Sequence, residues 1–448
     1  GAFSEDPEGN ILVGTERGGL NILDKKTENH FSLKGNEGET FADITIKSIK
    51  TTSPKTHWLG TFKQGLIRFD NQTKTFKRFP QNLDSAEFSS LSTSIINCLE
   101  TDSDGLLWLG LDNDESIAVF DIKSEKFIQH PVAEKIKALL RNKPVKHIAF
   151  SENGDIYLST RGHGLVHFDK QQNIVQAYQK FQNDTEIIGI TDVNHTAILD
   201  DELWVSTHGQ GLIRLVKEDK KLKHHIKMTN GLLSNIIYGT IANDYNSIWV
   251  MSSSGLSKIE AFNSEYKIKN YNYASGFPIQ EINEGAFFKS KSGDILVGGN
   301  NGYVVFNPKN LTDNSYIPQV ILSDLKISNK SVTPNDSQNV LDKPIYETKE
   351  ITLNYKQSIF TIEFALLNYL SPENNRYAYK LEGFDEDWID AGNNRTATYT
   401  NLKSDNYTFM VKGANNDNIW TELPTMLKIH VLPPPWKTWW AYLIYSLL

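Results

Sequence analysis

The alternation of apolar and polar residues repeats along the first two thirds of the chain. Its clearest part is an almost wholly apolar run, a polar loop that ends in glycine, and a second short apolar run. Two copies read TRGHGLVHFD (160–169) and THGQGLIRLV (207–216). The pattern occurs in seven segments, which are residues 10–24, 57–70, 106–121, 155–169, 202–216, 247–260 and 294–307.

These segments recur at a nearly fixed period in the forties. The equivalent apolar residues are Val13, Leu59, Leu109, Leu158, Val205, Val250 and Val297. Each unit contains an alternating first strand, a turn rich in Asp, Asn and Gly, an apolar second strand, and one or two further strands. A period of this length with about four strands per unit is typical of propeller blades. The sequence therefore predicts a seven-bladed β-propeller over residues 1–311.

A small residue follows the apolar second strand in six units: Gly14, Gly60, Gly110, Ser159, Ser206 and Gly298. We expect it to let adjacent blades approach closely. Met251 stands there in the sixth unit, so we expect the sixth blade to be irregular. The first unit opens directly at Gly1, and the seventh lacks a clear fourth strand. We therefore expect the natural chain to continue upstream and to complete the last blade.

After residue 317 the period disappears. Residues 318–432 contain short alternating strands such as IFTIEFALL and YTFMVKGAN, which predict an immunoglobulin- or fibronectin-like β-sandwich. Residues 433–448 begin with three prolines and continue into an apolar run rich in Trp and Tyr. This run is predicted to be a juxtamembrane segment and the start of a truncated transmembrane helix, since such rings suit the membrane interface. The alternative is an apolar tail packed on a domain.

Composition and charge exclude several classes of protein. The net charge is −8 and the basic residues are scattered, which excludes the basic surface that nucleic acid requires. The single cysteine, Cys98, excludes a disulfide framework and a cysteine zinc site. TDSDG (101–105) lacks the later ligands of a calcium loop, and adjacent His224 and His225 point apart in a strand. No metal and no cofactor are expected.

One stretch of the predicted sandwich resembles a known family. Residues 374–420 resemble the tyrosine-rich Y_Y_Y domain that follows two-component regulator propeller repeats, which the blades also resemble. The matching positions are Tyr377, Tyr379, Leu381, Gly383, Phe384, Trp388, Tyr399, Leu402, Tyr407 and Phe409. The departures are Ser404-Asp405, where the family often has Pro-Gly, and Gly413, where it usually has Ala.

This resemblance implies the periplasmic sensor region of a hybrid two-component system regulator of Bacteroidetes. Such proteins typically carry two propellers, the sandwich, one transmembrane helix, and then histidine kinase, receiver and DNA-binding modules. Many bind oligosaccharides and regulate polysaccharide utilisation. The resemblance thus implies a fragment that is not itself an enzyme. It also implies a homodimer at the periplasmic face of the inner membrane and an oligosaccharide ligand.

The candidate binding residues lie in loops between second and third strands, which emerge on one face of a propeller. They are Arg17, Gln64, Asn113, Arg161, His163, His208, Gln210, Asn300 and Asn301. Planar polar side chains of these types suit sugar recognition. Polar residues are also the default in hairpin loops, where glycine supplies the positive φ.

Two other functions remain open beside the sensor. A glycan-active propeller enzyme, a hydrolase or lyase with an accessory sandwich, predicts a deep axial pocket with clustered carboxylates of perturbed pKa. A protein-binding scaffold predicts a flat propeller face.

Overall fold

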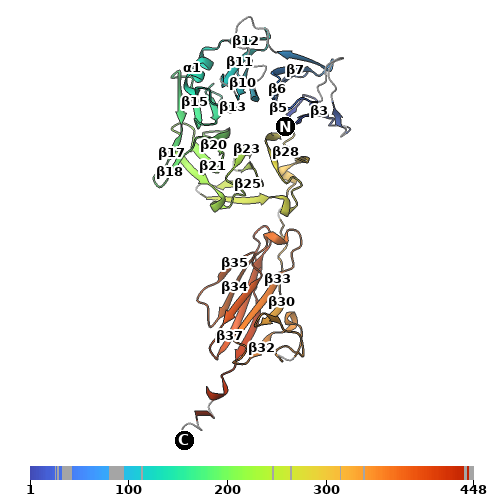
Figure 1. The fold of residues 1–448 in the computed structure, drawn as a ribbon, viewed down its shortest axis with the longest axis vertical. Helices are drawn as coiled ribbons and strands as arrows, with labels where there is room; N and C mark the ends of the chain where they lie inside the picture. The colour runs from blue at the N-terminus through green and yellow to red at the C-terminus, as the bar shows by residue number, and fades with distance from the viewer. Residues whose placement is uncertain are drawn as a thin grey trace. The chain divides into compact units, whose positions relative to one another are not determined.

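The structure is a computed structural model that describes residues 1–25, 27, 30–32, 43–79, 95–112, 115–244, 247–262, 265–312, 314–336, 339–437 and 441–442. The chain divides into two compact units. The first comprises residues 1–273 and 277–311, and the second comprises residues 274–276 and 312–448. Both are built of β-sheets, so the all-β prediction of a propeller and a sandwich is confirmed (Figure 1).

The first unit contains seven successive sheets, each ordered as in the sequence. Blade 1 has β1 (Ala2–Glu5), β2 (Ile11–Gly14), β3 (Leu20–Leu23) and β4 (His30–Ser32); blade 2 has β5 (Ile46–Ser53), β6 (Thr56–Thr61), β7 (Leu66–Asp70) and β8 (Thr75–Phe79); blade 3 has β9 (Ile96–Thr101), β10 (Leu106–Leu111), β11 (Ile117–Asp121) and β12 (Lys126–Ile128); blade 4 has β13 (Val145–Phe150), β14 (Ile156–Thr160), β15 (Leu165–Asp169) and β16 (Ile174–Tyr178). Blade 5 has β19 (Val193–Leu199), β20 (Glu202–Thr207), β21 (Leu212–Val216) and β22 (Leu222–Ile226); blade 6 has β23 (Ile237–Asp244), β24 (Ser247–Ser252), β25 (Gly255–Phe262) and β26 (Glu265–Tyr271); blade 7 has β27 (Ile282–Lys289), β28 (Ile295–Gly299) and β29 (Gly302–Phe306).

The first strand of each blade is the innermost strand of a closed ring. Each contacts the first strand of the next blade, and β1 contacts β27, which closes the ring (Figure 1). The apolar core lies between blades rather than within them. Trp58 of β6, for example, packs in one cluster with Leu107 and Phe120 of blade 3, with ring centroids of Trp58 and Phe120 5.0 Å apart. Burial of such aromatic side chains stabilises the contact between neighbouring blades.

The small residue after the second strand faces the next blade. A Cβ atom added at Gly14 would lie 2.6 Å from Cγ2 of Ile46, and one at Gly60 would lie 2.7 Å from Cγ2 of Ile96. Ile46 and Ile96 begin the innermost strands of the following blades. Heavy-atom contacts this short do not fit a close-packed interior, so a larger side chain would push the blades apart.

The expectation that blade 6 is irregular is wrong. It has four strands, like blades 2 to 5, and Met251 is fully buried. Met251 pairs across the ladder with Gly239 of the innermost strand. A Cβ atom at Gly239 would lie 2.0 Å from Cζ of Phe287 in blade 7. In blade 6 the small residue at the contact with the next blade is therefore on the first strand and not on the second.

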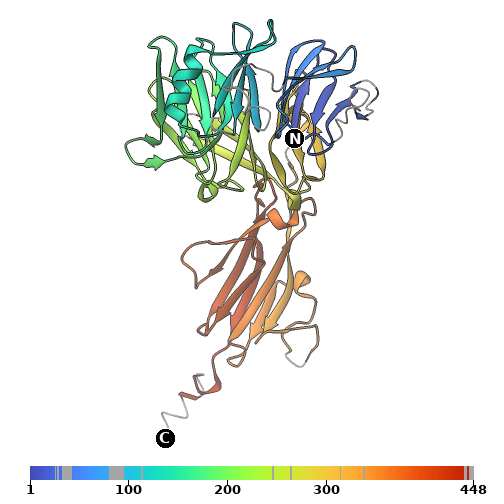
Figure 2. The same ribbon diagram turned by 45° about the horizontal axis from the view of Figure 1, so that its top comes forward.

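Two elements between blades were not predicted. Helix α1 (Pro131–Leu140) joins blades 3 and 4 and packs on β11 and β16 (Figure 2). Its proline stands in the first turn, where no intrahelical N–H bond is lost, and Ala133, Ile136 and Leu140 form the buried face at helical spacing. A hairpin of β17 (Lys180–Gln182) and β18 (Ile187–Gly189) joins blades 4 and 5.

The second unit is a sandwich of two sheets around one core. The first sheet has the order β31 (Lys330–Ser331), β30 (Val320–Ile327), β33 (Ile359–Leu366) and β36 (Thr396–Thr400). The second has the order β32 (Glu350–Leu353), β38 (Thr425–Val431), β37 (Asn406–Ala414), β34 (Arg376–Glu382) and β35 (Ile389–Gly392), with β32 and β38 parallel.

The tyrosines that carry the family resemblance have structural roles in this sandwich. The hydroxyl of buried Tyr377 accepts a hydrogen bond from the Leu366 N–H at 3.2 Å. Tyr399 donates to Asp385 at 2.9 Å, and Tyr407 donates to the Lys403 carbonyl at 3.1 Å. Each ring thus fills the core while its hydroxyl secures a loop or strand.

The expected start of a transmembrane helix lies mostly outside the described residues, since 438–440 and 443–448 are not among them. In the described part of the chain, no helix is long and apolar enough to cross a membrane.

We predict that Gly239→Ala lowers the free energy of unfolding of the propeller by about 1–3 kcal/mol, because the added methyl group overlaps Phe287. Urea unfolding followed by tryptophan fluorescence measures this. Gly189→Ala is the matched control, since a Cβ there meets no atom within 4 Å. Equal stability of the two variants would show that blade contact does not depend on position 239.

Candidate functional site

A concave site runs along the axis of the propeller. It has a volume of about 450 Å³ and is lined by residues of the innermost strands of all seven blades. This volume lies within the range of small-molecule sites in proteins. The cavity therefore has room for a small ligand.

The cavity carries more positive than negative charge. Five lysines and three glutamates line it, an excess of two positive charges: Lys47, Lys50, Lys146, Lys289 and Lys291 against Glu5, Glu100 and Glu284. Lys50 forms an ion pair with Glu100. The Lys289 ammonium donates to the carbonyls of Ala242 and Asn243 at 2.8 and 3.0 Å.

One ion pair crosses the axis. Nζ of Lys146 in β13 lies 3.2 Å from Oε1 of Glu284 in β27, so the pair joins blades 4 and 7. Burial, with a smaller effect from the charge of Glu284, raises the pKa of Tyr238 in the same wall. This ion pair and Tyr238 stand near the beginnings of their strands, at one end of the cavity.

Two histidines stack in the wall of the cavity. The rings of His147 in β13 and His195 in β19 lie 4.0 Å apart between centroids, and His195 meets Phe287 edge to face at 5.3 Å. Nδ1 of each ring is shielded and has no hydrogen-bond partner in the described residues. Burial, then the charge of Lys50, lowers the pKa of His147 to about 4. Burial lowers the pKa of His195 well below its usual value. Both rings are therefore neutral at pH 7.

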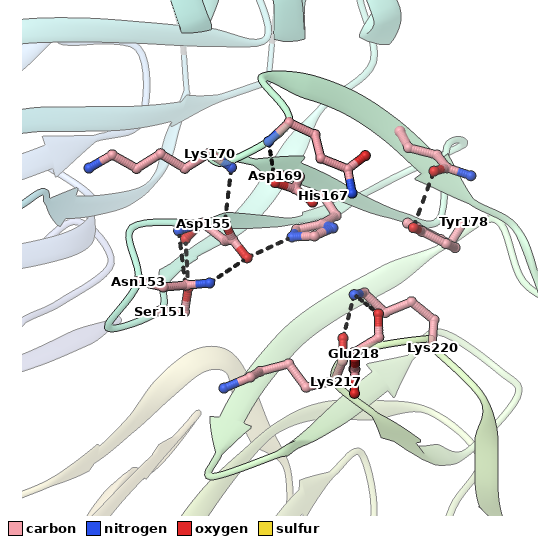
Figure 3. A network of polar contacts seen from close by, with 12 residues as sticks. Ser151, Asn153, Asp155, His167, Asp169, Lys170, Tyr178, Lys217, Glu218 and Lys220 are labelled. Atoms are coloured by element: carbon pink, nitrogen blue, oxygen red, sulfur yellow. Dashed lines mark hydrogen bonds and ion pairs between the residues drawn. The ribbon is translucent and has the colours of Figure 1, made fainter.

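Figure 3 shows a second polar cluster, formed by the β13–β14 turn, β15 and β16 of blade 4 and the β21–β22 turn of blade 5. Oδ2 of Asp155 lies 3.2 Å from Nε2 of His167, whose ring stacks on Tyr157 at 4.4 Å. Buried Lys220 places its ammonium 5.4 and 5.7 Å from the ring centroids of Tyr157 and Tyr178. Burial lowers the pKa of Lys220. Because Lys220 of blade 5 contacts the rings of two tyrosines of blade 4, the cluster joins these two blades.

The predicted binding residues lie in the loops that follow the second strands. Arg17, Arg161, His208, Gln210, Asn300 and Asn301 are exposed, Gln64 and His163 are half-buried, and Asn113 lies outside the described residues. These loops adjoin the segments that enter the innermost strands. The Arg161 N–H donates to the Pro144 carbonyl at 3.0 Å, and the Asn300 N–H donates to the Glu281 carbonyl at 3.3 Å.

The structure brings the loops of blades 4 and 5 together. Gly162 and Gly164 donate to the Thr191 carbonyl at 2.8 Å each, and His208 donates to the Asp192 carbonyl at 3.1 Å. Arg161, His163, His208 and Gln210 thus belong to two loops held on one connecting segment. The other predicted residues lie on blades 1, 2 and 7. Of the predicted residues that the structure describes, none lines the axial cavity.

The loops also have a clear structural cause. Thr207 ends the second strand of blade 5, and its hydroxyl donates to the Gly211 carbonyl at 2.7 Å and accepts from the Gln210 N–H at 3.0 Å. Gly211 has φ +75°, and a Cβ there would lie 2.3 Å from the Ile226 carbonyl oxygen. Glycine is therefore required to turn this corner, whatever the loop binds.

Sequence reasoning missed the axial cavity. The sequence signal was VKHIAF and VNHTAI, in which His147 and His195 occupy the same place in two first strands. A histidine at one position in consecutive blades marks the strand face that turns to the axis, because a ring stacks equivalent positions side by side.

We predict that lowering the pH from 7 to 5 destabilises the propeller through these histidines. The unfolded chain takes up protons near pH 6.5 and folded His147 only near pH 4, so stability present above pH 6.5 is lost as pH falls. The loss at pH 5 is on the order of 2 kcal/mol for His147. Urea unfolding at both pH values measures it.

The double variant His147→Gln, His195→Gln should show a smaller loss of stability than the parent chain. His208→Gln is the control, because that side chain is exposed. An unchanged pH dependence in the double variant would contradict the assignment to the cavity.

Comparisons with known proteins give the family of the second unit. Residues 368–432 match the Y_Y_Y domain family. The whole chain is 29% identical over 454 aligned residues to histidine kinase P4 of Formosa agariphila. The chain spans about a third of that protein, 32% of its length.

The fold is shared with one solved structure at a TM-score above 0.5. That structure is the extracellular domain of a putative one-component system from B. thetaiotaomicron. The match covers 97% of this chain and 56% of the other, at 21% identity and a TM-score of 0.52. The extracellular domain of a putative hybrid two-component system from that species matches over 96% and 72% of the two chains, at 18% identity and a TM-score of 0.35. The resemblance read from the sequence is confirmed by the match of residues 368–432 to the Y_Y_Y domain family and by the similarity of the whole chain to a histidine kinase.

Proposed function

We propose that this chain is the extracytoplasmic ligand-sensing region of a hybrid two-component histidine kinase. The ligand is an oligosaccharide, and the sandwich and a membrane helix transmit its binding to a kinase that regulates polysaccharide-utilisation genes. The observation that carries this proposal is the similarity to histidine kinase P4, which extends over the whole chain and includes both propeller and Y_Y_Y domain.

Membrane attachment and a homodimer belong to the same proposal. A sensor of this class transmits binding as a change in the arrangement of two protomers, and the sandwich is the unit next to the proposed membrane segment. The periplasmic face of the inner membrane is the location that this arrangement requires.

The cavity chemistry favours binding over catalysis. A glycosidase needs two carboxyl groups, one of which keeps its proton near neutral pH. Here Glu100 pairs with Lys50, and Glu284 pairs with Lys146 at 3.2 Å. Each of these two carboxylates is thus engaged by a lysine and is not placed opposite a second carboxyl group as its partner. The chain is therefore proposed to bind its ligand without converting it.

We predict that one class of oligosaccharide raises the thermal midpoint of this chain and is recovered intact. A ligand at a hundredfold excess over its dissociation constant stabilises the native state by about 2.7 kcal/mol. A thermal-shift screen of plant and host oligosaccharides, followed by chromatography of the ligand, measures both properties. Cleavage of the ligand would replace the sensor with the enzyme. A panel without any stabilising glycan, together with capture of a specific protein partner, would favour the scaffold.

The loop residues can be tested with the same ligand. The double variant Arg161→Ala, His208→Ala should weaken binding about tenfold or more, because each truncation removes a hydrogen-bonding group. Lys123→Ala is the matched control, since this exposed residue lies in a turn after the third strand of blade 3. Unchanged affinity in the double variant would show that these loops only connect strands and do not contact the ligand.

A further inference from the structure

We propose that the axial cavity of the propeller is a binding site for a small carboxylate-bearing ligand, which enters by displacing Glu284 from Lys146. This site is separate from the loop residues and does not require the sensed oligosaccharide to be acidic.

The charges of the cavity are the first observation. The two excess positive charges can be assigned to particular groups. In the described part of the chain, no hydrogen bond or ion pair engages the ammonium groups of Lys47 and Lys291. Lys291 contributes only its backbone N–H, which donates to Glu5 at 2.6 Å. A cavity with uncompensated ammonium groups favours an anion.

The ion pair across the axis is the second observation. Lys146 and Glu284 come from blades 4 and 7, so their contact spans the cavity instead of joining neighbouring strands. Lys146 is the second residue of its strand, as Lys47 is of β5, and Glu284 is the third of β27. The pair therefore stands at the end of the cavity where the innermost strands begin. A carboxylate that replaces Glu284 gains the Lys146 ammonium and lies at the same end as Lys47.

The stacked histidines are the third observation. Their rings are neutral at pH 7, and Nδ1 of each ring is shielded and receives no hydrogen bond from the described residues. Buried polar groups without partners are rare in native proteins and cost free energy unless a ligand or water satisfies them. His147 and His195 directly follow Lys146 and Asn194 in their strands, one position further along the axis. Hydroxyl groups of a bound sugar acid can form hydrogen bonds with these rings while its carboxylate lies beside Lys146, at the end of the cavity where the innermost strands begin.

The side chains at this end of the cavity suit the carboxylate and the hydroxyl groups of a sugar acid. The lysine ammonium is a point charge with rotatable donors, so it binds a carboxylate without the fixed planar geometry that the arginine guanidinium imposes. Asn194 already donates to the Ile237 carbonyl at 2.8 Å, which holds its amide in place and leaves its oxygen as an acceptor. Tyr238 adds a hydroxyl beside Glu284.

The test is isothermal titration calorimetry of the whole chain at pH 7 and low salt with D-glucuronate, and with D-glucose as the neutral match. Glucuronate is expected to bind with a dissociation constant of about 1 mM or tighter, and glucose at least about tenfold more weakly, since it lacks the charge. Succinate as a third probe distinguishes a sugar acid from an organic acid. Binding of succinate that depends on Lys146 supports the anion site with an organic acid as occupant.

Two variants give opposite expected effects. Lys146→Met should weaken glucuronate binding about tenfold or more, because the anchoring charge is lost. Glu284→Gln should strengthen it several-fold, because the competing carboxylate is removed while the shape is kept. Lys55→Met is the control, since Lys55 is exposed in the β5–β6 turn. Thermal midpoints identify any variant that fails to fold.

The proposal is overturned if glucuronate does not bind, if glucose binds equally well, or if Glu284→Gln weakens binding as Lys146→Met does. None of these outcomes bears on oligosaccharide sensing. That function fails separately, when no oligosaccharide stabilises the chain.

Discussion

The close approach of seven innermost strands around one axis is the constraint on which the propeller depends. Each of these strands contacts its two neighbours, and the ring closes between β27 and β1. The approach is possible because one residue of the facing pair is small, as at Gly60 and at Gly239. A single methyl group at these positions overlaps the next blade, so packing in the ring is set to within a fraction of an ångström.

This packing also fixes the chemistry of the axis. Side chains on the innermost strands alternate between the blade contact and the cavity, so a strand such as VKHIAF must place polar groups at the centre of the ring. These groups are held by rigid strands rather than by loops, which is the arrangement that keeps a site in place before a ligand arrives. The lysine–glutamate pairs in the cavity compensate most of its charges, and only a small positive excess remains.

Much of the fold could be predicted from the sequence because it rests on local periodicity. The period in the forties fixed the number of blades, and the tyrosine pattern of residues 374–420 indicated the sandwich. In blade 6 the small residue is Gly239 on the first strand, while the second strand carries Met251. This arrangement could not be predicted, since it depends on which residues pair across the ladder. Helix α1 was not predicted because its short VAEKIKALL pattern lies between two blade repeats, and the repeat pattern itself contains only strands.

The site was harder to predict than the fold. The loop residues were found because they lie beside the repeated glycines, and the structure shows that those glycines are needed to turn the chain. The cavity is formed by residues far apart in the sequence, such as Lys146 and Glu284, which meet only because blades 4 and 7 face each other across the axis. No local pattern contains that information. The similarity to histidine kinase P4 covers this whole chain and 32% of that protein, so it indicates the architecture and not the ligand of the cavity.

Hydrogen–deuterium exchange of the chain with a stabilising oligosaccharide, with chromatography of the ligand afterwards, tests the sensing account most directly. The account predicts slower exchange in the loops after the second strands or in the innermost strands of the propeller, with the ligand recovered unchanged. Cleaved ligand, or slower exchange confined to the sandwich, would contradict it.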